Sequence, residues 1–184
     1  MIKISAVIIT LNEEKNIVRC IRSLERVVDE VVVVDSFSTD KTEELVNNLG
    51  ARFIQHPFHG YRNQKNYAIQ QAKNDYILSL DADEALSSEL EESIIKIKNQ
   101  DTKDAYKISR LNNYKGKWIY NTDWYPESSI RLFDRRKGLW TGDNVHERVG
   151  LLHGTSVGKL NGDILHWRYG SYEEQLEDKI KDTT

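Results

Sequence analysis

The sequence predicts an α/β fold in which a mostly parallel sheet is flanked by helices and is followed by a mixed or antiparallel part. Two observations support it: short apolar runs alternate with amphipathic segments through residues 1–100, and short strand-like segments separated by glycine-containing turns follow. The 184 residues are 39% hydrophobic and 30% charged, which is typical of a soluble globular protein. We expect a single domain over residues 1–184, and a truncated C-terminus is one interpretation of its last residues.

The first half of the chain is predicted to form repeated strand–helix units. Apolar and β-branched runs at 4–9, 31–34, 51–55 and 76–80 are typical of strands that are buried on both faces. Helices are expected at about 14–24, between Asp40 and Gly50, at 64–72, and after Ser88, which has capping-box spacing with Glu91. Cys20 lies on the apolar face of the first helix, and as the single cysteine it can form no internal disulfide.

The second half is predicted to contain short strands at 105–111, 129–133, 139–140 and 164–167, before a polar helix that opens at Ser171. A net charge of -3 and a longest basic run of only three residues argue against nucleic acid as a partner. The apolar segment 4–11 is far shorter than the ~20 residues that a membrane span needs, and we expect no secretory signal. A cytoplasmic location is therefore expected.

Polar residues follow each of the four expected strands of the first half, at 10–14, 35–40, 60–66 and 81–83. Parallel strands end at one edge of the sheet, where ligands bind in open α/β folds. The chain has no glycine-rich phosphate loop, so a metal ion is the natural means of neutralising a bound phosphate. Asp81-Ala82-Asp83 offers two carboxylates around a small residue, as Mn²⁺ or Mg²⁺ prefers, although a lone triplet of this kind also occurs in solvated turns and caps.

Three blocks of sequence in the same order and spacing, 9–14, 33–42 and 80–84, resemble the inverting glycosyltransferases of family 2, which have the GT-A fold. The resemblance covers about residues 2–100 strongly and the remainder more loosely. It implies that residues 1–100 bind a nucleotide-sugar and that 101–184 bind the acceptor. The segment 140–147 resembles a subgroup that includes lipopolysaccharide core β-glucosyltransferases, in which Val-His-Glu follows a tryptophan.

The resemblance implies a donor site made from the ends of the first-half strands. Its nucleotide-sugar-binding residues would be Thr10, Asn12, Glu13, Asp35, Arg62, Lys65, Asp81, Ala82 and Asp83. Asp35 would accept a hydrogen bond from the base, and Asp81 and Asp83 would serve ribose, diphosphate and metal. The alternatives are an Asx-turn for Asp35, a first-turn acid for Glu13 and a solvated helix start for Arg62 and Lys65. For Asp40 a helix cap is favoured.

The acceptor-side half should supply the general base, for which Glu147 is the candidate. Asp143 and Asp123 are its rivals, and a surface ion pair with Arg148 or a lysine is the alternative role for Glu147. The metal would be Mn²⁺ or Mg²⁺, held by Asp83 and Asp81, with His146 or His166 as a further ligand. Four aromatic residues suit stacking on sugar rings or core packing: Trp118, Trp124, Tyr125 and Trp140.

The function expected from these features is metal-dependent, inverting transfer from a UDP-sugar or similar donor to a bacterial surface glycan such as lipopolysaccharide core. A sugar nucleotidyltransferase is the nearest alternative, although it normally has a glycine-rich basic loop where residues 10–14 are acidic. A non-catalytic nucleotide-sugar-binding domain is the other. Four basic residues could bind a phosphorylated acceptor or contact the inner face of the membrane, or they could form a solvated hairpin turn. They are Arg131, Arg135, Arg136 and Lys137.

Overall fold

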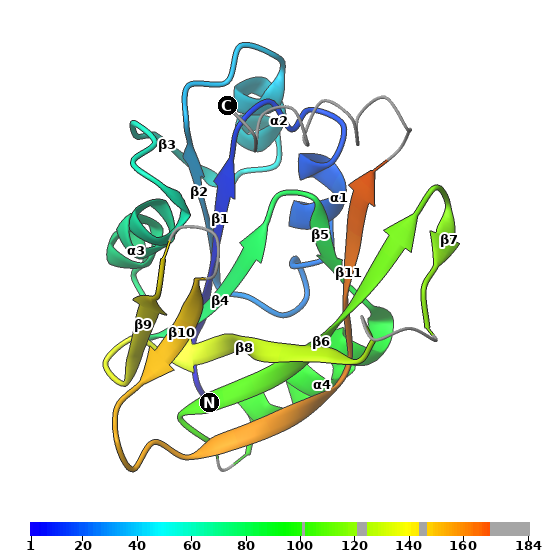
Figure 1. The fold of residues 1–184 in the computed structure, drawn as a ribbon. Coiled ribbons are helices and arrows are strands. Elements are labelled where there is room, and N and C mark those ends of the chain that lie inside the picture. Colours follow the sequence, from blue (N-terminus) through cyan, green and yellow to red (C-terminus); the bar gives the residue numbers. More distant parts are fainter. Residues whose placement is uncertain (101, 121–124, 144–146, 170–184) are drawn as a thin grey trace.

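The computed structural model describes residues 1–184 apart from 101, 121–124, 144–146 and 170–184. One large curled sheet has the strand order β3-β2-β1-β4-β8-β6-β11-β5, with β7 paired to β6, and β9 and β10 form a separate two-stranded sheet (Figure 1). The strands are β1 (Ile4–Thr10), β2 (Glu30–Asp35), β3 (Arg52–Gln55), β4 (Tyr76–Asp81), β5 (Glu84–Leu86), β6 (Ala105–Tyr114), β7 (Lys117–Trp118), β8 (Glu127–Asp134), β9 (Gly138–Thr141), β10 (Arg148–Leu151) and β11 (Val157–Tyr169).

The first half forms the parallel part of the sheet, in the order β3-β2-β1-β4. The order reverses beside β1, because β2 and β3 lie on one side of it and β4 lies on the other. In open α/β sheets a ligand binds beyond the carboxyl ends of the strands at such a point. In the second half β8 is antiparallel to both β4 and β6, whereas β6 and β11 are parallel, as the predicted mixed part requires.

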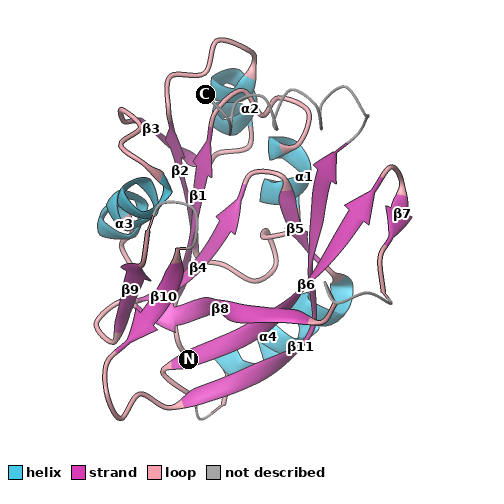
Figure 2. Ribbon diagram, in the orientation of Figure 1, coloured by secondary structure: helices cyan, strands magenta, loops and turns pink. Residues whose placement is uncertain are grey.

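Helices cover both faces of the parallel strands (Figure 2). They are α1 (Ile17–Arg22), α2 (Thr42–Asn48), α3 (Tyr61–Gln71) and α4 (Ser88–Lys98). Alternate residues of β1 point to opposite faces: Ile8 belongs to the core that includes Ile17 and Cys20 of α1, whereas Val7 belongs to the core that includes Ala68 of α3. The predicted fold class is confirmed.

Several local predictions need correction. Helix α1 begins only at Ile17, and the backbone N–H groups of Asn16 and Ile17 both donate to the carbonyl of Glu13 in the turn before it. Ser87, not Ser88, caps α4, since its hydroxyl accepts a hydrogen bond from the N–H of Leu90. Strands β5, β7 and β10 are additional, and the polar helix expected after Ser171 lies outside the described residues. Among the described residues, no helix is long and apolar enough to cross a membrane.

Candidate functional site

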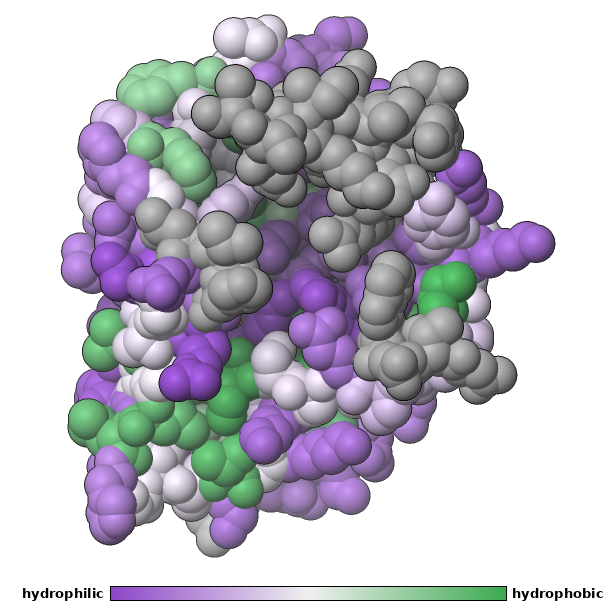
Figure 3. All heavy atoms as spheres, viewed as in Figure 1, coloured by the Kyte–Doolittle hydropathy of each residue, from purple (hydrophilic) through white to green (hydrophobic). Residues whose placement is uncertain are grey.

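The predicted donor-site strands end side by side. In the parallel register Thr10 pairs with Asp35, and Ile9 pairs with Asp81. On the face shown in Figure 3, hydrophilic residues line a hollow near the centre of the molecule. The shared edge that sequence reasoning proposed for these carboxylates therefore exists.

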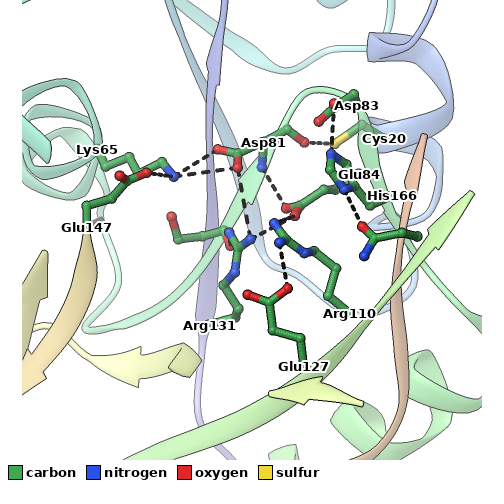
Figure 4. Close-up of polar contacts among 12 residues, drawn as sticks. Cys20, Lys65, Asp81, Asp83, Glu84, Arg110, Glu127, Arg131, Glu147 and His166 are labelled. Atoms are coloured by element: carbon green, nitrogen blue, oxygen red, sulfur yellow. Dashed lines mark hydrogen bonds and ion pairs between the residues drawn. The ribbon is translucent and has the colours of Figure 1, made fainter. Parts of the chain in front are cut away.

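Asp81 lies between two buried cations (Figure 4). Nζ of Lys65 is 3.2 Å from its Oδ1, and Nη2 of Arg131 is 3.9 Å from its Oδ2. Burial alone would raise the pKa of Asp81, but the charges of Lys65 and Arg131 outweigh burial and lower that pKa to about 2. The Asp81 carboxylate is therefore ionised at neutral pH and is already balanced by positive charge.

Glu84 holds the turn that carries Asp81, Ala82 and Asp83. Its Oε2 accepts a hydrogen bond of 2.9 Å from the N–H of Asp81, and its Oε1 lies 2.7 Å from Nη2 of Arg131. Arg131 is only 5% exposed, so the expectation that it belongs to a solvated turn or a membrane-facing basic set is wrong. Its place between apolar neighbours in β8 was the signal that sequence reasoning missed.

Asp83 faces His166 of β11. Nε2 of His166 lies 3.1 Å from Oδ2 of Asp83, and Nδ1 lies 2.7 Å from Oδ1 of Asn112, which orients the ring. A carboxylate and an imidazole at this separation suit a divalent cation whose remaining ligands are diphosphate oxygens and water. The described residues contain no cluster of three or more such ligands, and His146 lies outside them. Of the two histidines considered, only His166 can be placed beside Asp83.

The loops after β1 and β2 are locked together. Asn12, with a positive φ of 55°, accepts a hydrogen bond from the N–H of Thr39 through its side chain, and its own N–H donates to Oγ of Ser38. Asp35 is fully buried and accepts hydrogen bonds from the N–H and the hydroxyl of Ser38. These contacts form the turn that was the alternative role for Asp35. A hydrogen bond between Asp35 and the base of a nucleotide stays a prediction.

The remaining residues of these loops differ in their surroundings. Thr10 is buried, and its Oγ1 has no hydrogen-bond partner among the described residues. Glu13 accepts a hydrogen bond from Nδ2 of Asn16, while burial and the nearby Asp83 raise the pKa of the Glu13 carboxyl. Asp40 accepts hydrogen bonds from the N–H groups of Thr42 and Glu14, but Lys41 is the N-cap residue of α2, so Asp40 lies one position before the cap position predicted for it.

Helix α3 brings the β9–β10 hairpin to the edge of the sheet where the predicted donor-site strands end. Nζ of Lys65 lies 3.0 Å from Oε1 of Glu147 and 4.4 Å from the ring centroid of Trp140, and Arg62 donates a hydrogen bond to the carbonyl of Gly142. The structure thus joins Glu147 to Asp81 through one ammonium group. Asp143 is exposed in the same hairpin, and Asp123 lies outside the described residues.

The basic turn between β8 and β9 lies apart from this site. Arg135 and Arg136 form ion pairs with Asp75, and Arg136 also pairs with Asp134. Of the predicted aromatic set, Trp140 is buried in the core beneath Lys65, and Trp118 packs edge-on against Trp167. Trp124 lies outside the described residues.

Residues 5–160 match the protein-family model of glycosyl transferase family 2. The chain belongs to this family. It is 38% identical over 189 aligned residues to an uncharacterized glycosyltransferase of Rickettsia typhi, a match that covers 97% of this chain and 64% of the relative. Less than two thirds of that relative's length is therefore represented here.

Three further matches show what this member of the family is similar to. It is 33% identical to the lipopolysaccharide core biosynthesis glycosyltransferase LpsC of Rhizobium meliloti, over 98% of this chain and 69% of LpsC. The structure of S. aureus TarS in complex with UDP-GlcNAc superposes with a TM-score of 0.64 at 17% identity, over 94% of this chain and 60% of that one. A TarS structure in complex with UDP matches at 25% identity and a TM-score of 0.52, over 65% of this chain and 38% of that one.

Proposed function

We propose that this glycosyltransferase transfers a sugar from a UDP-sugar to a bacterial surface glycan such as lipopolysaccharide core, with inversion at the anomeric carbon. The observation that carries the proposal is the Lys65 ammonium group, which lies 3.2 Å from Asp81 at the donor edge and 3.0 Å from Glu147 on the acceptor side. The relation to LpsC supports the class of acceptor, and the relation to TarS bound to UDP supports the class of donor.

In this proposal Glu147 is the general base. Its carboxylate takes the proton of the acceptor hydroxyl while that oxygen attacks the anomeric carbon from the side opposite the diphosphate. A new glycosidic bond forms as the bond between the anomeric carbon and the phosphate oxygen breaks, so that UDP leaves with the bonding electron pair. General-base help of this kind contributes about 10²–10⁴ in rate. The Glu147 side chain is 16% exposed, and its Oε1 lies 3.0 Å from Nζ of Lys65.

The donor-side residues bind and orient the nucleotide-sugar. Thr10 offers a buried hydroxyl without a partner among the described residues, and Asp83 with His166 would hold Mn²⁺ or Mg²⁺, whose charge would stabilise the departing diphosphate. Lys65 and Arg131 keep Asp81 ionised and fixed in place. Because Asp81 already faces these two cations, we assign it to the ribose or to metal-bound water, and we assign direct metal contact to Asp83.

The test compares the wild-type chain with Glu147→Gln and with the control Asp143→Asn, which changes an exposed carboxylate of the same hairpin. Glu147→Gln should bind UDP with Mn²⁺ as the wild type does and lose about 10²–10⁴ in transfer rate, whereas Asp143→Asn should retain both. Transfer retained by Glu147→Gln would place the base elsewhere. UDP binding without transfer to any acceptor would favour a non-catalytic domain, and no binding at all would refute the enzyme assignment.

A further inference from the structure

We infer that Asn66 of α3 is a positioning residue, which fixes the β9–β10 hairpin and with it Glu147 relative to Asp81. The inference rests on the proposed function in so far as it gives Glu147 the role of base. It concerns the arrangement of this chain's own residues, and neither a metal nor a nucleotide is needed to measure it.

One side chain satisfies both backbone polar groups of Trp140. Nδ2 of Asn66 donates to the carbonyl of Trp140 at 2.9 Å, and the N–H of Trp140 donates to Oδ1 of Asn66 at 3.0 Å. A strand at the edge of a sheet presents unpaired N–H and C=O groups to whatever lies beside it. Asn66 therefore takes the place that a neighbouring strand would have beside β9.

The hairpin depends on such support. A two-stranded hairpin alone is marginally stable at best in water, so its position is set by what it packs against. In the antiparallel register Trp140 pairs with Val149 and Thr141 pairs with Arg148. Glu147 directly precedes Arg148, so the placement of the Trp140 backbone determines where the Glu147 carboxylate lies.

Replacing Asn66 tests the position of the hairpin without removing a charge from the site, which replacing Lys65 would do. Lys65 contacts Glu147 but also Asp81, so replacing Lys65 would disturb the donor edge as well. Both hydrogen bonds between Asn66 and Trp140 go to backbone atoms of the hairpin. Asn63 lies one turn earlier on the same helix and donates to the carbonyl of His59, which makes it a matched control.

The experiment compares the full chain with Asn66→Asp, Asn66→Ser and Asn63→Asp. Asn66→Asp keeps the shape but places a carboxylate oxygen against the carbonyl of Trp140, and Asn66→Ser is too short to reach both groups. A misplacement of about 1 Å can cost about 100-fold in rate, so both Asn66 variants should lose about 100-fold in kcat. Their dissociation constant for UDP with Mn²⁺ should stay within about twofold, and Asn63→Asp should match the wild type.

Amide hydrogen exchange of the Trp140 N–H gives a second measurement that requires no activity. It should be faster in both Asn66 variants and unchanged in Asn63→Asp. The inference is overturned if either folded Asn66 variant keeps wild-type kcat, if UDP affinity falls in parallel with kcat, or if Trp140 exchange does not change. If the wild-type chain itself transfers no sugar, the proposed function fails, and the exchange measurement still decides the positioning role.

Discussion

Arg131 and Glu84 form an ion pair shielded from solvent, with 2.7 Å between Nη2 and Oε1 and side-chain exposures of 6% and 0%. The pair connects β8 to the turn after β4, because Glu84 also accepts the hydrogen bond from the N–H of Asp81. Burial raises the pKa of Glu84, and the charge of Arg131 opposes that shift. The geometry of the donor edge thus depends on a charge supplied by the second half of the chain.

Replacing Arg131 with Met should destabilise the fold strongly. The substitution removes the cation that lies 2.7 Å from the buried Glu84 carboxylate and leaves Arg110, whose Nη1 is 4.0 Å away. Breaking a buried pair in this way costs about 3–5 kcal/mol. The free energy of unfolding from urea denaturation, compared between Arg131→Met and the wild type at pH 7, measures the loss.

Arg26→Met is the matched control, since the Arg26 side chain is 68% exposed and its contact with Glu91 is 3.4 Å long. An exposed pair contributes at most about 1 kcal/mol. The double variant Arg131→Met/Glu84→Gln should recover much of the stability, because no unpaired charge remains inside. A loss in Arg131→Met no larger than that in Arg26→Met would show that the buried pair is not what holds the turn.

Asp83→Asn should weaken UDP binding only in the presence of Mn²⁺. The amide removes one of the two proposed protein ligands, and loss of even an indirect metal contact costs about 10–100-fold in affinity. Calorimetric titration with UDP, with Mn²⁺ and with EDTA, measures the difference. Asp143→Asn, at an exposed carboxylate, should behave as the wild type. If Asp83→Asn keeps the full effect of Mn²⁺, the metal lies elsewhere.

The donor edge could be predicted from the sequence because its geometry follows from the strands themselves. Parallel strands of similar length end together, so the proximity of Thr10, Asp35 and Asp81 required only that the runs before them be strands. The turn after β2 could be predicted as an alternative role for Asp35, because Asp35 and Ser38 are only three positions apart in the sequence.

The contacts between α3 and the β9–β10 hairpin could not be predicted, because they join residues far apart in the sequence. Asn66 and Trp140 are 74 positions apart, and nothing near either residue indicates the other. Arg131 was grouped with its basic neighbours, although Leu132 and Phe133 beside it are fully buried. The available signal for the pair with Glu84 was the position of Arg131 between Ile130 and Leu132. A cation inside an apolar run needs a partner carboxylate.

Asp134 should make the stability of the fold depend on acid pH. Burial alone would raise its pKa, but hydrogen bonds from Arg136 outweigh burial and hold it below the ordinary value of 3.8. A carboxyl whose pKa is depressed in the folded state stabilises the fold above the unfolded pKa, and this stabilisation is lost as pH falls through the folded pKa. Asp134→Asn should therefore cost about 1–2 kcal/mol at pH 7 and progressively less below pH ~4. Urea midpoints of both proteins across this range measure the effect, and a constant difference at every pH would contradict it.

Gly162 of β11 should tolerate no side chain. Its φ is 86°, and a Cβ there would lie 2.2 Å from the backbone nitrogen of Leu90 in α4. Gly162→Ala combines a left-handed backbone that costs about 1–2 kcal/mol with an overlap that costs about 1–3 kcal/mol. Gly154→Ala is the control, because Gly154 has a φ of 80° and nothing within 4 Å of the added carbon. It should show the backbone cost alone in urea denaturation. Equal losses in the two variants would mean that β11 moves away from α4 freely, and the position of His166 on that strand would then not depend on this contact.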